Sequence, residues 1–563
     1  MIFSFGYHSH FQTVALAFGV SATLFLGQLH GQTKPTDKPD KTKAEQPLEL
    51  PEFVITGVES LDVPGGAKQS PKPASKLTQQ DIRRFNPLDK QSFSLLPMQS
   101  IGRMLLPQQE KDGFVRGEFG MFITPSLEAG YRAVLGNFDL NANAAFTLSN
   151  GHRRNADFTD AALNLASTYL APEKFFFFGG SRTDTRLSVH NRSYKFFGAD
   201  SATFPETAPE RSLLRLEADV QTVGSFENWQ YDMGASLESA LLSGSHANTA
   251  LKGHISAQTT LGTLHLGGKT DVAFVQSSKG ALGEQYRFAP SLLVGYRADG
   301  FALSAELGAH IVNDGFDGSG TTVRPAAMLQ ARLAASDVLT LELSGMTGVR
   351  PKYLIDALRI NPYVPIALAS ALPQYYFERV LYDVTASARV QPTRNIAFTL
   401  GGSASRTDAA MLFQPTAVNG EISPLFASTS IIGTFAEAYL QFTENDILTT
   451  RINARFGMRF SPTGTVEQGV PYLIPIEGRV VYRRAWLPQL ETQVEAVYVG
   501  NRTVLASPDL PAYWDVRLNA EYRITQSISI YARGTNLLNQ QITLWQRYQE
   551  RGIFIALGFV ITF

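Results

Sequence analysis

The sequence predicts an all-β protein: a transmembrane antiparallel β-barrel of about 22 strands with a short N-terminal periplasmic segment. Three observations predict this fold. Charged residues make up only 18% of the 563 residues, whereas about 25% is usual for soluble proteins. No run of about 20 apolar residues, the length that a membrane helix needs, follows residue 30. Polar and apolar residues instead alternate with period two over most of residues 111–563, which is typical of strands between lipid and a wet lumen.

The chain divides by composition into four segments. Residues 1–31 hold a short apolar run, residues 13–27, which has the length of a signal-peptide core although no Lys or Arg precedes it. Residues 32–49 are rich in Pro, Lys and Asp and cannot bury enough apolar surface to fold, so we expect a disordered linker. Residues 50–110 form a mixed segment, and residues 111–563 carry the strand pattern. The sequence therefore predicts an exported chain with a large C-terminal barrel.

The alternation is clearest in residues 447–460. Ile452 and Phe456 fall on one face, whereas Arg451 and Arg455 fall on the other, and a helix would scatter these charges around its axis. A face this polar suits a water-filled lumen and not the core of a soluble sandwich. The same pattern recurs in other segments and gives six inward arginines as lumen candidates: Arg451, Arg455, Arg459, Arg517, Arg523 and Arg533.

These six arginines have two interpretations that the sequence leaves open. Guanidinium groups along a water-filled lumen attract anions. They also pair with carboxylates on neighbouring strands, such as those of Asp515 and Glu521, and then stabilise the packing of the wall. Both interpretations place the side chains in the lumen.

The predicted connections alternate in length. Short turns, such as those near residues 299–300 and 444–446, separate hairpin strands, and longer polar loops lie between them, the longest at residues 189–211 and 351–379. In outer-membrane barrels the short turns face the periplasm and the long loops face outside. One predicted strand, residues 174–188, leads into the first of these long loops.

Aromatic residues gather in the two longest predicted loops. They fit either a recognition surface outside the cell or the interfacial girdle that membrane barrels carry. We assign residues 375–377 to the girdle because they abut a predicted strand. The aromatic residues concerned are Tyr194, Phe196, Phe197, Tyr353, Tyr363, Tyr375, Tyr376 and Phe377.

A short box of strand-forming side chains interrupts the polar tract at residues 50–57. An extended peptide on a flexible tether is suited to adding a strand to the sheet edge of another protein. The box resembles that of the TonB-dependent outer-membrane receptors, and this resemblance implies pairing with the energy-coupling protein TonB in the periplasm. The alternative is a local strand that packs on the chain's own barrel. The residues of the box are Glu52, Phe53, Val54, Ile55, Thr56 and Gly57.

Two patches of the barrel region resemble the same family, one over residues 116–154 and one over residues 534–563. In outer-membrane barrels a terminal Phe on an alternating strand acts as an assembly signal, and the resemblance assigns this role to Phe559, Ile561 and Phe563. The family has a plug domain after the box. Only the 53 residues from 58 to 110 separate box and barrel here, so we expect a reduced plug-like region or none.

Composition and motifs exclude several function classes. The chain has no Cys, which removes disulfides and thiolate metal sites, and its net charge of -1 gives no basic footprint for nucleic acid. The nine His are dispersed, and His190, which falls in a predicted outer loop, has no partner at metal-ligand spacing. We therefore predict no catalytic residues, no metal site and no cofactor.

These observations lead to one function and two alternatives. The first is a TonB-dependent-receptor-like transport or binding protein for a small ligand, located in the cell outer membrane. Its expected partners are outer-membrane lipid, the barrel assembly machinery, TonB and an unidentified small ligand. The alternatives are a passive outer-membrane pore without a plug and a structural outer-membrane subunit that binds a partner protein through its long loops.

Overall fold

The computed structural model describes most of the chain after residue 111. The predicted signal peptide, linker, TonB-box-like segment and plug-like region lie outside the described residues. The described ranges are 112–175, 178–199, 208–243, 246–277, 285–313, 320–352, 354–365, 377–416, 420–461 and 464–563.

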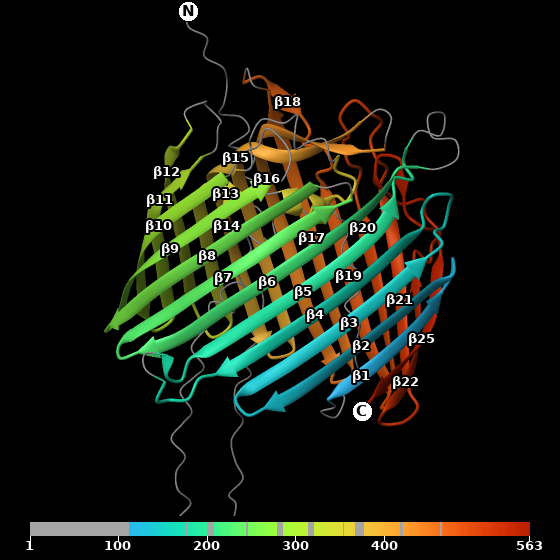
Figure 1. Cartoon of the computed structure of the whole chain (residues 1–563), viewed down its shortest axis with the longest axis horizontal. Helices are drawn as coiled ribbons and strands as arrows, with labels where there is room; N and C mark the ends of the chain where they lie inside the picture. Colours follow the sequence, from blue (N-terminus) through green and yellow to red (C-terminus); the bar gives the residue numbers. More distant parts are fainter. Residues whose placement is uncertain are drawn as a thin grey trace, which may run out of the picture. The chain divides into compact units, whose positions relative to one another are not determined.

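The described residues form a closed antiparallel β-barrel, as Figure 1 shows. Its wall contains 22 strands. Each strand pairs with its neighbour in sequence, and β1 also pairs with β25, which closes the ring. The predicted fold class and strand number are therefore confirmed. The strands of the first half are β1 (Gly113–Gly120), β2 (Thr124–Leu135), β3 (Phe138–Ser149), β4 (Phe158–Leu170), β5 (Arg182–Lys195), β6 (Glu210–Phe226), β7 (Trp229–Leu242), β8 (His246–Leu261), β9 (Leu264–Ser277), β10 (Gln285–Ala298) and β11 (Phe301–Val312).

The second half of the wall follows the same up-and-down order. Its strands are β12 (Thr322–Ala334), β13 (Leu339–Pro351), β14 (Phe377–Thr393), β15 (Ile396–Pro415), β16 (Ile422–Thr443), β17 (Asp446–Phe460), β19 (Ile476–Leu487), β20 (Leu490–Val499), β21 (Tyr513–Arg523), β22 (Ile528–Thr535) and β25 (Phe554–Thr562). The long connections hold the helix α4 (Leu354–Ile360), the hairpin β23 (Thr543–Trp545) and β24 (Tyr548–Gln549), and β18 (Val466–Gln468), which extends the sheet beside β17.

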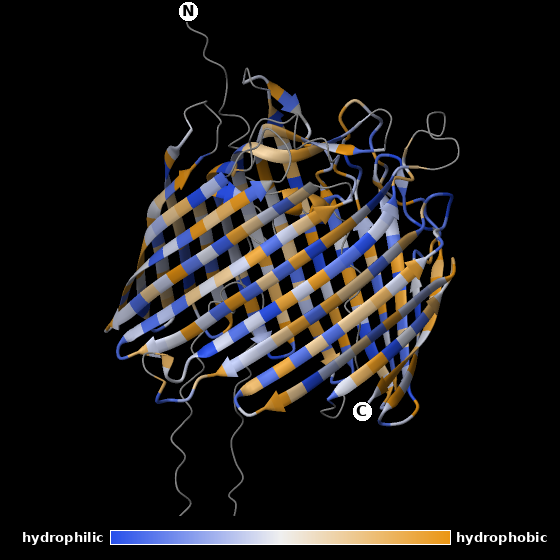
Figure 2. Cartoon of the chain, viewed as in Figure 1, coloured by the Kyte–Doolittle hydropathy of each residue, from blue (hydrophilic) through white to orange (hydrophobic). Residues whose placement is uncertain are grey.

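The wall separates an apolar outer face from a polar inner face. Ile452 and Phe456 on β17 are 53% and 66% exposed, and Leu292 on β10 is 66% exposed. Exposure of these apolar side chains would be unfavourable in water, but it is not when the outer face contacts lipid. Figure 2 shows the alternation as bands of hydrophilic and hydrophobic residues along the strands. No helix among the described residues is both long and apolar enough to cross a membrane. The apolar outer face and the polar inner face (Figure 2) are those of a barrel that crosses a bilayer with its strands.

The seam between β1 and β25 combines glycines with aromatic side chains. Gly117 pairs with Phe559, and a Cβ at Gly117 would lie 2.6 Å from the Phe559 ring. Phe563 covers Gly113 in the same way, at 2.5 Å. The glycines thus leave room for the two aromatic rings to lie flat on the β1–β25 pair, on the side that faces lipid. The predicted assembly-signal residues Phe559, Ile561 and Phe563 all lie on this outer stripe, with 42%, 40% and 58% exposure.

One predicted strand and the loop after it have wrong bounds. The strand predicted over residues 174–188 begins too early: residues 174, 175 and 178–181 lie in the connection after β4, where Ser181 N donates to Phe178 O, and residues 182–188 form the first half of β5. The run of four Phe at 175–178 has no polar residue to alternate with, so its periodicity could not set the boundary. The following loop is therefore shorter than predicted, and His190 lies on β5 and not in a loop.

A charge on the outer face tests the assignment of the two faces. Leu292→Arg places a guanidinium in mid-strand toward lipid and should destabilise the folded barrel by about 2–4 kcal/mol. Ser291→Arg, the neighbouring position on the lumen side, should change stability far less. Denaturant titration of both variants folded into lipid vesicles checks this, and equal losses would contradict the assignment.

Candidate functional site

Long connections on one end of the barrel share a buried apolar core. Their side chains pack together and against the ends of β6 to β9. We call this structure the loop cap. Its buried loop and strand-end members are Ile355, Ala357, Leu358, Val364, Met411, Phe413, Ile422, Tyr472, Val504, Leu510, Trp545 and Tyr548. Because the cap lies at the end with the long loops, it faces outside the cell (Figure 1).

The centre of the loop cap is a stack of two tyrosines. The rings of Tyr363 and Tyr548 lie 3.6 Å apart with an interplanar angle of 18°. Phe197 contacts Tyr548 edge-on at 4.8 Å, and the Tyr548 hydroxyl donates to Gly420 O at 2.5 Å. Burial raises the pKa of both tyrosine hydroxyls, so the stack stays neutral at physiological pH.

These contacts bridge the mouth of the barrel. Phe197 belongs to the β5–β6 connection, Tyr363 to the β13–β14 connection and Tyr548 to the β22–β25 connection. Eight wall strands separate the first connection from the second, eight separate the second from the third, and six separate the third from the first. Phe197 lies two residues after the end of β5, so the three loops meet above that side of the rim, and the β13–β14 and β22–β25 connections must each cross the mouth to reach it.

Two buried arginines fasten the loops to each other. Arg211, 2% exposed, donates to Pro362 O at 2.9 Å and to Val364 O at 2.6 Å. Arg502, 1% exposed, donates to Thr543 O at 2.5 Å and to Leu544 O at 3.0 Å. A buried cation is costly unless its donors are satisfied, so withdrawal of either loop segment would leave a guanidinium without these acceptors.

The β13–β14 connection folds inward and contacts the lumen wall. Arg359 at the end of α4 pairs with Glu217 on β6 at 2.6 Å and with Glu238 on β7 at 3.5 Å. Tyr194 on β5 donates to Pro362 O. The β13–β14 connection therefore contacts the inner face of three wall strands, β5, β6 and β7. Its described residues are held against the wall and do not extend outward as a surface loop would.

A hollow of about 500 Å³ opens at the outer side of the cap. Its lining includes Arg153, Arg547, Gln546 and three further amide or hydroxyl side chains. Asp509 is the single carboxylate among the lining residues. The Arg153 guanidinium lies 5.7 Å from the Phe197 ring centroid. The hollow therefore offers many donors and a positive charge, which suits a small anionic or carbonyl-rich ligand.

His152 supports the rim of this outer hollow. Its Nε2 donates to Gln549 O at 2.9 Å. Partial burial, opposed by this hydrogen bond, lowers the pKa of His152, and the positive charges of Arg153 and Arg551 lower it further. The neutral ring is thus the form that fits the cap.

The six arginines predicted for the lumen lie on three strands: Arg451, Arg455 and Arg459 on β17, Arg517 and Arg523 on β21, and Arg533 on β22. Five of them form ion pairs with carboxylates, as the wall-stabilising interpretation expects, and the attraction of anions stays a prediction. The pairs are Arg451–Glu437 at 3.2 Å, Arg455–Glu477 at 3.8 Å, Arg459–Glu467, Arg517–Asp515 at 2.7 Å and Arg533–Glu118.

The aromatic residues do not lie where the girdle interpretation places them. Phe377 is 3% exposed and packs with Val312 and Val349, so its assignment to the girdle is wrong. Tyr194 and Phe196 are 5% and 3% exposed and belong to the cap and its base. Residues 375 and 376 lie outside the described ranges. Tyr194, Phe196 and Phe377 are buried because the long loops turn inward and cover side chains that a surface loop would expose.

Sequence reasoning missed Arg211, Arg502 and Tyr548. Each acts through partners more than 40 positions away in the chain, and no local period marks such contacts.

Comparisons with known proteins show which fold this barrel shares. No family model matches the chain, and no curated protein is similar to it in sequence. Solved structures are similar in fold: the FrpB iron transporter from Neisseria meningitidis has 10% identity and a TM-score of 0.62, covering 81% of this chain and 82% of that one. The barrel has the fold of the TonB-dependent outer-membrane receptors.

Two further structures with this receptor fold match over the same share of each chain. The siderophore receptor PiuA from Acinetobacter baumannii has 8% identity and a TM-score of 0.61, covering 81% of this chain and 82% of that one. The ferric-catecholate import receptor Fiu from E. coli K12 has 8% identity and a TM-score of 0.58, with the same coverage. At these identities the TonB-dependent receptor fold is shared, while individual site residues are this chain's own.

Gly420→Ala tests whether the loops are packed as one cap. Gly420 has φ +71°, and an added Cβ would lie 2.6 Å from Ala199 N. Gly464, in another long loop, has φ +81° and open space around it. A left-handed non-Gly residue costs about 1–2 kcal/mol at either position, but only Gly420→Ala adds a clash.

Hydrogen exchange measures the outcome. Gly420→Ala should speed exchange in residues 354–365 and 541–550, which belong to other loops of the cap, and Gly464→Ala should not. Faster exchange confined to residues next to position 420 would show that the loops are not coupled.

Proposed function

We propose that this protein is a gated outer-membrane transport receptor that captures a small anionic or carbonyl-rich ligand outside the cell and passes it inward with energy from TonB. The observation that carries the proposal is the loop cap, which bridges the mouth from three sides of the ring. A receptor must hold its mouth closed until a ligand and an energy source act, and a cap with its own apolar core provides that resting state.

The loop cap argues against a passive pore. A pore needs an open water path, whereas two of the described loops cross the mouth to reach a third, and Arg211 and Arg502 fasten them. Opening this path requires separating buried apolar surface and breaking charge-assisted hydrogen bonds, which are stronger than neutral ones. Solute flow at rest is therefore disfavoured.

A structural subunit is also disfavoured. That alternative relies on long loops that reach outward to a partner protein. The described part of the β13–β14 connection instead reaches into the lumen, where Arg359 pairs with Glu217 and Glu238. Its apolar residues Ile355 and Leu358 are buried in the cap and are not presented to a partner.

The ligand chemistry follows from the outer hollow. Arg153 and Arg547 supply charge, and the amide side chains supply oriented donors. Similar structures are named as receptors or transporters of iron, ferric catecholate and siderophores. These names favour transport over catalysis, and they favour a compact, oxygen-rich ligand for this hollow.

The N-terminal roles remain part of the proposal. Residues 1–31 direct export, residues 32–49 tether, and residues 50–57 pair with TonB by adding a strand to its sheet. The stripe of Phe559, Ile561 and Phe563 directs assembly, which fits its position beside the strand pair that closes the ring.

Binding of the full-length protein to the periplasmic domain of TonB tests the coupling. Ile55→Pro removes a backbone donor from the middle of the box and should weaken binding at least about tenfold, because strand addition depends on main-chain hydrogen bonds. Thr42→Pro, in the linker, is the matched control and should bind as the unmodified chain does. Absence of binding in the unmodified chain would exclude TonB coupling and favour an uncoupled protein.

A further inference from the structure

A row of four charged side chains and one threonine crosses five adjacent wall strands on the lumen side. Backbone pairing places Arg389 of β14 opposite Thr399 of β15, Thr399 opposite Glu437 of β16, Glu437 opposite Arg451 of β17, and Arg451 opposite Arg479 of β19. Arg389, Thr399, Glu437 and Arg451 lie near the short-turn ends of their strands, and Arg479 joins them through its pairing with Arg451. We call these residues the arginine row.

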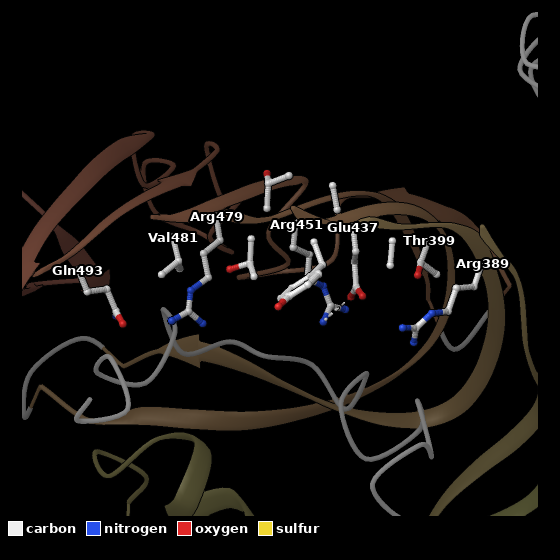
Figure 3. A pocket seen from close by; sticks show the side chains of 12 residues that line it. Arg389, Thr399, Glu437, Arg451, Arg479, Val481 and Gln493 are labelled. Carbon is white, nitrogen blue, oxygen red and sulfur yellow. Dashed lines mark ion pairs between the residues drawn. The ribbon is translucent and has the colours of Figure 1, made fainter. Parts of the chain in front are cut away.

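The arginine row lines a hollow of about 480 Å³. Figure 3 shows the side chains of Arg389, Arg451 and Arg479 extending into the same space. Gln493, Tyr439 and Thr449 add an amide and two hydroxyls, and Glu437 is the single carboxylate among the lining residues. The hollow thus presents three guanidinium groups and several neutral donors.

The charges of the row are not balanced within the described residues. Arg451 pairs with Glu437 at 3.2 Å, and Arg479 pairs with Glu495 at 2.6 Å. Arg389 has no carboxylate partner among the described residues, and its side chain donates to Gln391 Oε1 at 3.3 Å. The hollow therefore keeps a positive charge that faces the lumen.

The register itself points to an anion. Arg451 and Arg479 are direct cross-strand neighbours, and like charges placed directly opposite each other destabilise a sheet. One carboxylate on each side offsets part of this repulsion. An anion between the two guanidinium groups would remove the remainder and would also satisfy Arg389, because guanidinium forks bind the oxygens of carboxylates and phosphates in pairs.

We propose that the arginine row is an anion-binding site in the lumen, distinct from the outer hollow, for a group with several charged oxygens such as phosphate or a polycarboxylate. The site lies on the periplasmic half of the wall, so it is placed to receive an anion after it has left the outer hollow. The inference does not depend on TonB coupling, because it concerns the charge of the wall alone.

The absence of Cys allows a direct test of the local charge. Thr399→Cys introduces the single thiol of the chain, in the middle of the row. A negatively charged methanethiosulfonate should modify it about threefold faster than a neutral one, and a positively charged one about threefold slower, as one unit charge at roughly 7 Å in water would cause.

A matched thiol on another part of the wall is the control. Asn164→Cys on β4 lies in the row that continues through Ser188 to Glu217 and Glu238, whose carboxylates pair with Arg359 and Lys252. Because these charges balance, the three reagents should differ far less in rate there. Arg389→Gln should reduce the preference at Thr399→Cys, whereas Arg287→Gln, a lumen arginine on β10, should leave it unchanged.

Ligand binding is measured with inorganic phosphate and with citrate on the full-length chain. Either anion should slow the labelling of Thr399→Cys but not that of Asn164→Cys, and Arg389→Gln should weaken this protection about tenfold, as expected for one lost charge-assisted hydrogen bond. Protection by phosphate alone or by citrate alone identifies the oxygen group that the site prefers. Equal labelling by reagents of both charges, or no protection by either anion, would overturn the proposal. These outcomes leave the TonB measurement unaffected.

Discussion

The pairing of β1 with β25 is the constraint on which the rest of the structure depends. Inside a bilayer no water satisfies free backbone groups, so a sheet is stable there only when it has no edges. The seam achieves this with seven paired positions and with aromatic rings that cover Gly113 and Gly117. Closure fixes the ring at 22 strands, and with it the distance that any loop must cross to meet another loop over the mouth.

The loop cap follows from that distance. A short loop cannot reach the middle of so wide a ring, and a long loop without an apolar core would be mobile. Here three connections from nearly equidistant points meet at Phe197, Tyr363 and Tyr548, and buried arginines fix the segments behind them. The wall below carries a basic row from β14 to β19, whereas the carboxylates of Glu217 and Glu238 on β6 and β7 pair with Arg359 and Lys252. The rigid wall, the closed cap and the basic row together favour the proposed transport receptor over an open channel or a scaffold.

The sequence predicted what depends on local period and missed what depends on distance. The alternation around Ile452 and Arg451 predicts a strand with two faces, and repetition of that pattern predicts the closed barrel. The boundary of β5 was wrong because four successive Phe carry no alternation. Phe377 was misassigned because the loops fold inward, which no local pattern records. The arginine row was only partly visible, since Arg451 was recognised from its strand while Arg389 and Arg479 join it through register across separate hairpins.

Single-channel conductance in a planar bilayer tests the central claim that the loop cap closes the mouth. The full chain should show little conductance, and so should a chain lacking residues 32–110, because the cap alone bridges the mouth. Further removal of the hairpin residues 541–549 should then raise the conductance in large steps, since Tyr548 and Trp545 join this hairpin to the other loops of the cap. A large, steady conductance in the chain that lacks residues 32–110 but keeps the hairpin would contradict the account and make the protein a pore.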